Sequence, residues 1–427
     1  MSFLNPFLKD KKNESSDISL VGDSITVETL KRLIPIRGFS DEILQAFATE
    51  HKSEVYSKKT VLFRINDTTD SILYLLKGTI VLSDDKGNTY EVEAEAAKAK
   101  FPLSSGTKHT TTALAKTEVS LLRVQQKIMT DRQTSLNGHT EISIPDHLTD
   151  NRLLHSFLEH YDSEALELPT LPDIALKLRK AMLQDIGIAD AVKIIQLDPV
   201  ISAKLIEVAN CPLYMTPIPA KTCFTAVSRI GLNATRNLVI SLSINHIFKT
   251  NSPLIKFYLD KIWKNSLYIS TLCHVLATLT KQVNPEEALL AGLICDIGTV
   301  PFLNFAANLP KDYYTETELN LALQLVKGPI GYKILVEWGF SDEFIKIPLY
   351  SDDWYQNTSS ELNLVDIVVL SRLHSLIGQT GMTELPAITS IPAASKLKNF
   401  SLSPEHSLNL LYEAKSQIND AMKVLAN

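Results

Sequence analysis

The sequence has little cysteine, no long apolar run and no concentration of charge of one sign. The four cysteines, Cys211, Cys223, Cys273 and Cys295, lie in apolar segments and lack the Cys-x-x-Cys spacing of zinc and redox sites. This predicts reduced, buried thiols in a cytoplasmic protein. No uninterrupted apolar run reaches the roughly 20 residues that span a membrane, and the N-terminus has no apolar signal core. We therefore expect neither a membrane protein nor a secreted one.

The charge balance argues against a protein that coats nucleic acid. Lys and Arg number 42 and Asp and Glu number 48, which gives a net charge of −6 without a basic block. We expect no nucleic acid among the partners. At 427 residues and 45% hydrophobic content, the chain is long and apolar enough for two or three domains with their own cores.

The first part of the chain predicts a small β-structure. Residues 1–27 are polar near their start and are predicted to be flexible, and residues 28–130 contain short strands separated by turn signals. The expected strands are 60–64, 71–76, 79–82, 89–92 and 119–124. This pattern indicates a β-roll with flanking helices.

Residues 28–130 resemble the cyclic-nucleotide-binding fold. The resemblance lies in Asn-Asp at 66–67, Tyr-Leu-Leu-Lys-Gly-Thr-Ile at 74–80 and Thr-Ala-Leu-Ala at 112–115. It implies a ligand cassette with a Gly-Glu pair for ribose and an arginine for the cyclic phosphate. Residues 96–115 contain neither, and His109 stands at the place of the arginine with Lys108 beside it.

A neutral imidazole cannot reproduce the bidentate contact between guanidinium and phosphate. The favoured interpretation is a β-roll without a nucleotide, kept for packing or protein contact. The alternative is that Lys108 and His109 bind a cyclic nucleotide or another small anion.

The second part of the chain predicts helices only. Residues 131–163 are interpreted as a linker and a connecting helix, and residues 164–427 as an all-α domain with a C-terminal helical extension that begins near Ser403. Its most unusual stretch is 289–298, an apolar helix that ends in Cys295-Asp296. Gly298 is predicted to stop this helix in the left-handed conformation. Asp296 is either a metal or catalytic carboxylate or a buried carboxylate with hydrogen-bonded partners.

The second part also resembles the HDOD family, the HD-related output domain of bacterial signalling proteins. The motifs follow one another in the family's order: Leu-Pro-Thr-Leu-Pro at 168–172, Asp-Pro at 198–199, Val-Ala-Asn at 208–210 with Tyr214, Ala-Val-Ser-Arg-Ile-Gly at 226–231, Trp-Lys-Asn-Ser at 263–266, Cys-Asp-Ile-Gly at 295–298 and Trp-Gly-Phe at 338–340. The resemblance covers about 200 residues.

The parent HD superfamily implies a divalent metal held by histidines and aspartates, which activates water against a phosphoester. Here Asn265 stands at the first histidine, Cys295 at the histidine of the His-Asp pair and Lys327 near a later one. Only Asp296 remains. His274 lies nine residues after Asn265 and does not replace it. We expect no catalytic residue, no metal and no cofactor, and we expect Lys327 to pair with Asp296.

Together these features predict a multidomain α+β protein, with a cyclic-nucleotide-binding-like β-roll of jelly-roll type followed by an all-α HDOD domain. The expected function is non-catalytic signal transduction, with the HDOD domain binding another signalling protein. Two alternatives stay open. One is a metal-dependent phosphohydrolase that acts on nucleotides, and the other is a sensor with a small-molecule ligand in the β-roll.

Overall fold

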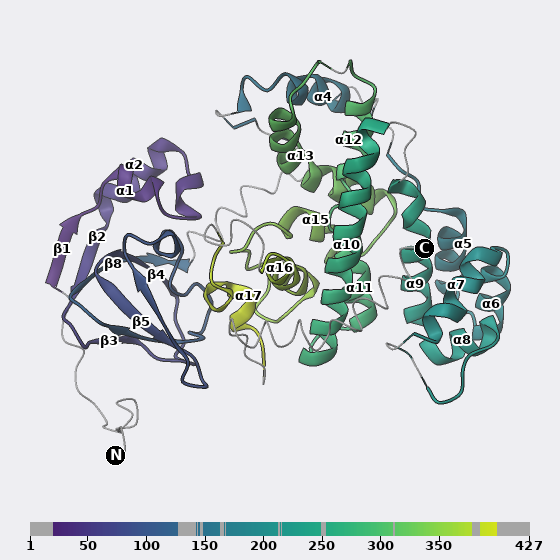
Figure 1. Cartoon of the computed structure of the whole chain (residues 1–427), viewed down its shortest axis with the longest axis horizontal. Helices are drawn as coiled ribbons and strands as arrows, with labels where there is room; N and C mark the ends of the chain where they lie inside the picture. The colour runs from purple at the N-terminus through teal and green to yellow at the C-terminus, as the bar shows by residue number, and fades with distance from the viewer. Residues whose placement is uncertain are drawn as a thin grey trace. The chain divides into compact units, whose positions relative to one another are not determined.

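The computed structural model describes residues 20–126, 142, 144–145, 148–162, 166, 168–211, 214, 216–248, 253–310, 312–377 and 385–398. The chain divides into two compact units (Figure 1). The first contains residues 1–128 and 383–391, and the second contains residues 129–382 and 392–427.

The first unit contains two antiparallel four-stranded sheets (Figure 1). One sheet has the order β1 (Leu20–Ser24), β2 (Lys52–Tyr56), β8 (Val119–Gln125) and β4 (Ser71–Lys77). The other has the order β3 (Val61–Phe63), β7 (Thr112–Ala115), β5 (Thr79–Ser83) and β6 (Thr89–Glu93). The short helical elements of this unit are α1 (Val27–Lys31), η1 (Ile36–Gly38), α2 (Asp41–Glu50), η2 (Ala97–Lys100) and η7 (Ile388–Ser390).

Alternating apolar residues and tight turns explain the sheets. Leu73, Leu75, Ile80, Leu82 and Leu121 belong to one buried apolar cluster. Between β4 and β5 the chain turns at Gly78, whose φ is +88°. A Cβ there would lie 2.3 Å from the carbonyl oxygen of Glu118, so only glycine fits this turn.

The boundaries of the first unit differ from the sequence prediction in two places. β1 lies inside residues 1–27, which were predicted to be flexible; that prediction is wrong for Leu20–Ser24, because Leu20 and Val21 pair with β2. Residues 1–19 lie outside the described residues. Segment 385–391 groups with the β-roll, although the sequence assigned it to the helical domain. Neither feature has a local sequence signal, because both depend on partners distant along the chain.

The second unit is helical throughout its described residues. Its helices, in chain order, are α4 (Arg152–Asp162), α5 (Asp173–Met182), α6 (Ile188–Ile195), α7 (Pro199–Ala209), α8 (Cys223–Ile230), α9 (Leu232–Ile244), η5 (Asn245–Phe248), α10 (Pro253–Thr280), α11 (Pro285–Ile294), α12 (Thr299–Ala307), α13 (Glu316–Glu337), α14 (Asp342–Ile345), α15 (Ile347–Tyr350), α16 (Leu364–Ser375) and α17 (Pro392–Ser395). With the strands of the first unit, they confirm the predicted α+β class. The helix predicted to begin near Ser403 lies outside the described residues.

Side-chain caps fix several helix starts in the helical unit. Asp198 accepts hydrogen bonds from the first-turn amides of α7, and Asn284 does the same for α11. At the start of α13, Thr315 and Glu318 form a capping box.

The stretch Pro285–Ala307 is long and apolar enough to cross a membrane by length and composition alone. It consists of two helices, α11 and α12, that are separated at Cys295–Gly298. Within the described residues, 89% of its most apolar window is buried inside the protein. The stretch is therefore a core segment of the helical unit.

Candidate functional site: a buried charge cluster at the end of α11

The unusual aspartate at the end of α11 is buried. Asp296 is 5% exposed and follows Cys295, which is 1% exposed and donates its thiol hydrogen to the carbonyl of Gly292 at 3.1 Å. Burial and the neighbouring Asp296 charge both raise the pKa of the Cys295 thiol well above its ordinary value. Cys295 is therefore a neutral thiol, which is a poor nucleophile and a poor metal ligand.

Two cations hold the carboxylate of Asp296. The Lys327 amine, from α13, lies 3.0 Å from one carboxylate oxygen, and the Arg372 guanidinium, from α16, lies 2.9 Å from the other. The ion pair that the sequence predicted for Lys327 is therefore present. Both cations also bind Asp352, which lies 2.5 Å from Arg372 and forms an ion pair with Lys327. We call these four residues the charge cluster.

The charges in the cluster balance. Burial alone raises the pKa of Asp296, but Arg372 and Lys327 outweigh it and hold that pKa well below its usual range. Burial alone lowers the pKa of Lys327, and the two aspartates reverse this and raise it. Asp296, Lys327 and Arg372 therefore stay ionised together, because the carboxylate of Asp296 contacts both cations.

Gly298 does not have the predicted left-handed conformation. Its φ is −65° and its ψ is −10°, which is right-handed helical backbone at the start of α12. That prediction is wrong, and the glycine has another reason. A Cβ on Gly298 would lie 1.9 Å from the carbonyl oxygen of Lys327 and 2.5 Å from the amide nitrogen of Gly331. Glycine is needed so that the turn after Asp296 can lie against α13 and bring Lys327 close.

Not every residue predicted for the degenerate pocket reaches the cluster. Asn265 is exposed on α10 and is not among the described residues that contact Asp296. His274, on the same helix, is buried, and desolvation lowers its pKa to about 4. The ring of His274 lies near that of Tyr214 and not at the cluster.

The residues present do not fit the divalent metal that the HD superfamily implies. In the described parts of the chain, no group of three or more His, Cys, Asp or Glu side chains could hold a metal ion. The two aspartates that could serve as ligands already contact two cations, which would repel a metal at that place. The described residues around Asp296 therefore do not fit a divalent metal.

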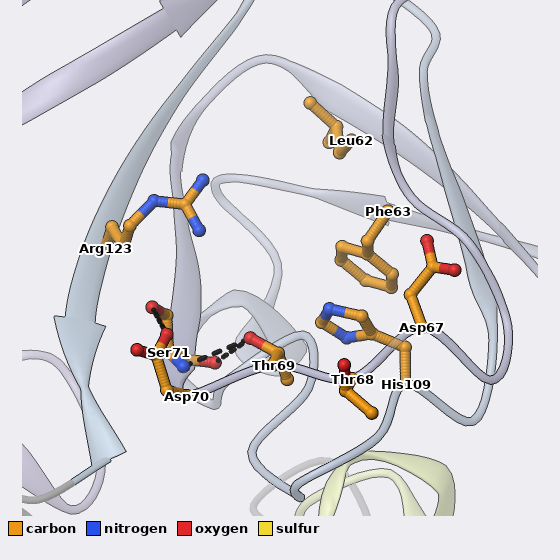
Figure 2. A pocket seen from close by; sticks show the side chains of 9 residues that line it. All are labelled: Leu62, Phe63, Asp67, Thr68, Thr69, Asp70, Ser71, His109 and Arg123. Carbon is orange, nitrogen blue, oxygen red and sulfur yellow. Dashed lines mark hydrogen bonds between the residues drawn. The ribbon is translucent and has the colours of Figure 1, made fainter. Parts of the chain in front are cut away.

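The β-roll contains a separate pocket of about 640 Å³ (Figure 2). Its lining residues are Leu62, Phe63, Asp67, Thr68, Thr69, Asp70, Ser71, His109 and Arg123. His109 is 5% exposed, and its ring stacks on Phe63 with centroids 4.0 Å apart. Burial lowers the pKa of His109. Lys108 is exposed and is not one of the lining residues.

The charges of this pocket differ from those of a phosphate site. Asp67 and Asp70 line it, and His109 is neutral because of its burial. The guanidinium of Arg123 donates three hydrogen bonds to the carboxylate of Glu54, of 2.9, 3.2 and 3.1 Å. An anion would therefore meet two carboxylates and an arginine that already has a partner.

One family model matches part of the helical unit. Residues 168–353 match the family model described as the HDOD domain. These residues are an HDOD domain. The match ends before α16, so it includes Asp296, Lys327 and Asp352 but not Arg372. The sequence prediction for this family is confirmed.

Two solved structures resemble about two thirds of this chain. A protein from Shewanella amazonensis SB2B, named "Putative metal-dependent phosphohydrolase", is 25% identical and has a TM-score of 0.55; the match covers 64% of this chain and 100% of that one. An HDOD domain protein with unknown function from Geobacter sulfurreducens is 20% identical and has a TM-score of 0.50, covering 65% and 99%. These likenesses show the fold.

The N-terminal region matches cyclic-nucleotide-binding-like proteins. One from Brucella abortus bv. 1 str. 9-941 is 23% identical and has a TM-score of 0.21; the match covers 25% of this chain and 97% of that one. A comparison with curated proteins gave no match.

Sequence reasoning missed half of the charge cluster. Asp352 follows α15 in a polar loop, and nothing around it marks it as a partner of Lys327. Arg372 did leave a signal, because it is a lone arginine in the otherwise apolar or small-residue stretch 367–373. A cation in so apolar a helix needs a carboxylate partner, and that requirement could have pointed to Asp296.

Proposed function

We propose that this protein is a non-catalytic, cytoplasmic component of signal transduction whose HDOD domain binds another protein. The observation that carries the proposal is the charge cluster. Asp296 is held by Lys327 and Arg372 instead of a metal, so the chemistry of metal-activated water has no place in this pocket. On this proposal the HDOD fold binds a partner protein with its surface and catalyses no reaction.

The distribution of exposed apolar side chains supports a binding role. Among the described residues, eleven large apolar side chains are exposed, and five of them fall between residues 183 and 224. These are Leu183, Leu197, Val200, Ile218 and Phe224. They belong to helices α5 to α8 and their connections, which lie together in Figure 1. Leu197 and Val200 are each 67% exposed, and a partner that covered them would remove this apolar surface from water.

The first experiment measures metal content and hydrolysis. The purified full-length protein is analysed for transition metals, and its activity on bis(p-nitrophenyl) phosphate is measured with added Mn²⁺ or Mg²⁺. We expect less than a tenth of an equivalent of metal and no rate above the metal-only blank. A stoichiometric metal with measurable hydrolysis would contradict the proposal.

The second experiment tests the binding surface. The double variant Val200→Ser, Phe224→Ser is compared with wild type in quantitative capture from the native cytoplasm. Val336→Ser is the matched control, because Val336 is also exposed but lies on α13. We expect a captured protein that falls at least fivefold with the double variant and stays unchanged with the control. Equal capture by all three chains would contradict a role for this surface.

The pocket of the β-roll favours a second, narrower candidate, a small polar ligand. The hydroxyls of Thr68, Thr69 and Ser71 with the carboxylates of Asp67 and Asp70 suit a neutral or cationic molecule better than an anion. Thermal unfolding with millimolar cyclic AMP or cyclic GMP should therefore leave the melting temperature unchanged. A clear rise would instead favour the anion-sensor function with His109 in the site.

A further inference from the structure

Segment 385–391 lies on the β-roll although it comes late in the chain. The Lys98 amine donates to the carbonyl oxygen of Leu385 at 2.6 Å. The Tyr90 and Thr389 hydroxyls are hydrogen-bonded at 3.0 Å. These two contacts hold Leu385 and Thr389 on residues that belong to η2 and β6.

Two further hydroxyls bind the main chain of this segment. Ser105 donates to the carbonyl of Ser390, and Thr110 donates to the carbonyl of Thr389. Ile388 and Ile391 are 6% and 1% exposed, so their side chains are buried as well. Donors aimed at successive carbonyls, combined with buried apolar side chains, are how a protein binds a peptide. This face of the β-roll therefore binds a peptide, and its occupant is the chain itself.

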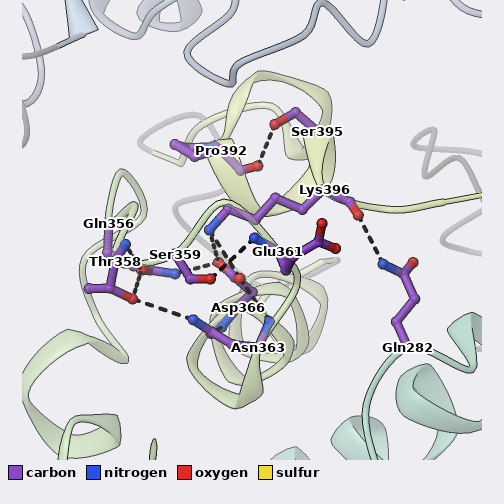
Figure 3. Close-up of polar contacts among 10 residues, drawn as sticks. All are labelled: Gln282, Gln356, Thr358, Ser359, Glu361, Asn363, Asp366, Pro392, Ser395 and Lys396. Atoms are coloured by element: carbon purple, nitrogen blue, oxygen red, sulfur yellow. Dashed lines mark hydrogen bonds and ion pairs between the residues drawn. The ribbon is translucent and has the colours of Figure 1, made fainter.

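A few residues later the chain is held in place a second time, by Lys396 in the helical unit. Lys396 forms an ion pair with Asp366 near the start of α16, with its amine 2.9 and 3.0 Å from the two carboxylate oxygens (Figure 3). The two side chains are 3% and 0% exposed. The side chain of Gln282 binds the carbonyl of Lys396 at 3.1 Å. Only the short helix α17 separates Ile391 from Lys396, so the connection has almost no slack.

Helix α16 carries Asp366 at one end and Arg372 near the other. Arg372 belongs to the charge cluster, so the helix that receives Lys396 also supplies a cation to Asp296. We propose that residues 385–396 are a coupling segment. When its first part leaves the β-roll, Lys396 loosens from Asp366, and when that ion pair opens, the segment leaves the β-roll. The two events must influence each other equally, because they share one equilibrium.

The first arm of the test removes the contacts at the β-roll. Ser105→Ala, Thr110→Val is made in the full chain, and amide hydrogen exchange is followed at α17 and at the first turn of α16. We expect exchange at least fivefold faster there, with β8 and α11 unchanged. Thr89→Val is the control, because Thr89 is an exposed threonine of the β-roll with no side-chain hydrogen bond among the described contacts. If the double variant fails to fold, Thr110→Val alone is used.

The second arm removes the ion pair. Asp366→Asn, Lys396→Met takes away both charges, so no buried charge is left without a partner. We expect at least fivefold faster exchange at Ser390, whose amide binds the carbonyl of Ala387. Lys398→Met is the control, because the Lys398 side chain forms an exposed ion pair with Glu361 and its contact with Gln282 is made by the main chain, which the substitution keeps. The proposal is overturned if α17 and the first turn of α16 keep wild-type exchange rates in the first arm, or if Ser390 keeps its wild-type rate in the second. A passive linker would not transmit either change.

Discussion

The helical unit contains two buried aspartates, one whose pKa its surroundings lower and one whose pKa they raise. Asp296 contacts two cations, and its pKa is held well below the ordinary value despite burial. Asp366 contacts one cation, Lys396, and there burial prevails and raises the pKa. Asp366 also accepts hydrogen bonds from Gln356 and from the amide of Asn363. The two carboxylates differ in the second cation, Arg372, whose charge and hydrogen bond lower the pKa of Asp296 and have no counterpart at Asp366.

The most damaging change we expect is Asp296→Asn. It leaves Lys327 and Arg372 buried with only the half-exposed Asp352 as a partner, so we expect a loss of about 3–5 kcal/mol in the free energy of unfolding. Chemical denaturation measures it. Asp352→Asn is the control and should cost much less, because the Asp352 side chain is 46% exposed. Equal losses would mean that Asp296 is not the centre of the cluster.

Lys396→Met should cost less, about 2–3 kcal/mol, because Asp366 keeps its other hydrogen bonds and can take up a proton. The raised pKa of Asp366 has a direct consequence for pH. The penalty of an ionised Asp366 is present above its folded pKa and is relieved as the pH falls through that value. The loss should therefore be smaller at pH 4.5 than at pH 7.5. A loss that grows on acidification would contradict this.

Gly298→Ala tests whether close approach of α12 to α13 is needed to form the charge cluster. The new methyl group would collide with the carbonyl of Lys327, and we expect a loss of about 2 kcal/mol. Gly187→Ala is the matched control, because nothing lies within 4 Å of a Cβ there. Its effect should stay within about 0.5 kcal/mol. Similar stability of the two variants in denaturant would show that α13 can move away freely.

The smallest effect concerns acid stability. The folded pKa of Asp296 lies below its unfolded value, so its contribution is present above about pH 4 and is lost as the pH falls through the folded pKa. Between pH 4.5 and pH 3, the free energy of unfolding should therefore fall more steeply in wild type than in Asp296→Asn. If urea denaturation gives the same pH dependence of the free energy of unfolding for both proteins, Asp296 does not contribute to acid stability.

The sequence predicted two residues of the charge cluster, Asp296 and Lys327, but not the other two, Asp352 and Arg372. The end of α11 at Cys295-Asp296 and the ion pair with Lys327 were predicted and are present. Asn265 was placed in the pocket on the strength of the family motif, yet it is exposed. Arg372 lies outside the HDOD match, so the family motif gave no indication of it. The conformation of Gly298 was predicted wrongly, because helix ends usually need glycine for φ and here it is needed for space.

What the sequence determined by itself is local. Asn284 and Asp198 bind amides within three residues of themselves, so the chain's own order fixes these helix starts. What only the tertiary structure decided is which distant polar and charged groups contact each other. Asp296 meets Arg372 from 76 residues away, and Ser105 meets Ser390 from 285 residues away. Such partners share no local pattern, because the free energy of burying a charge is settled by whatever the fold brings within about 3 Å of it.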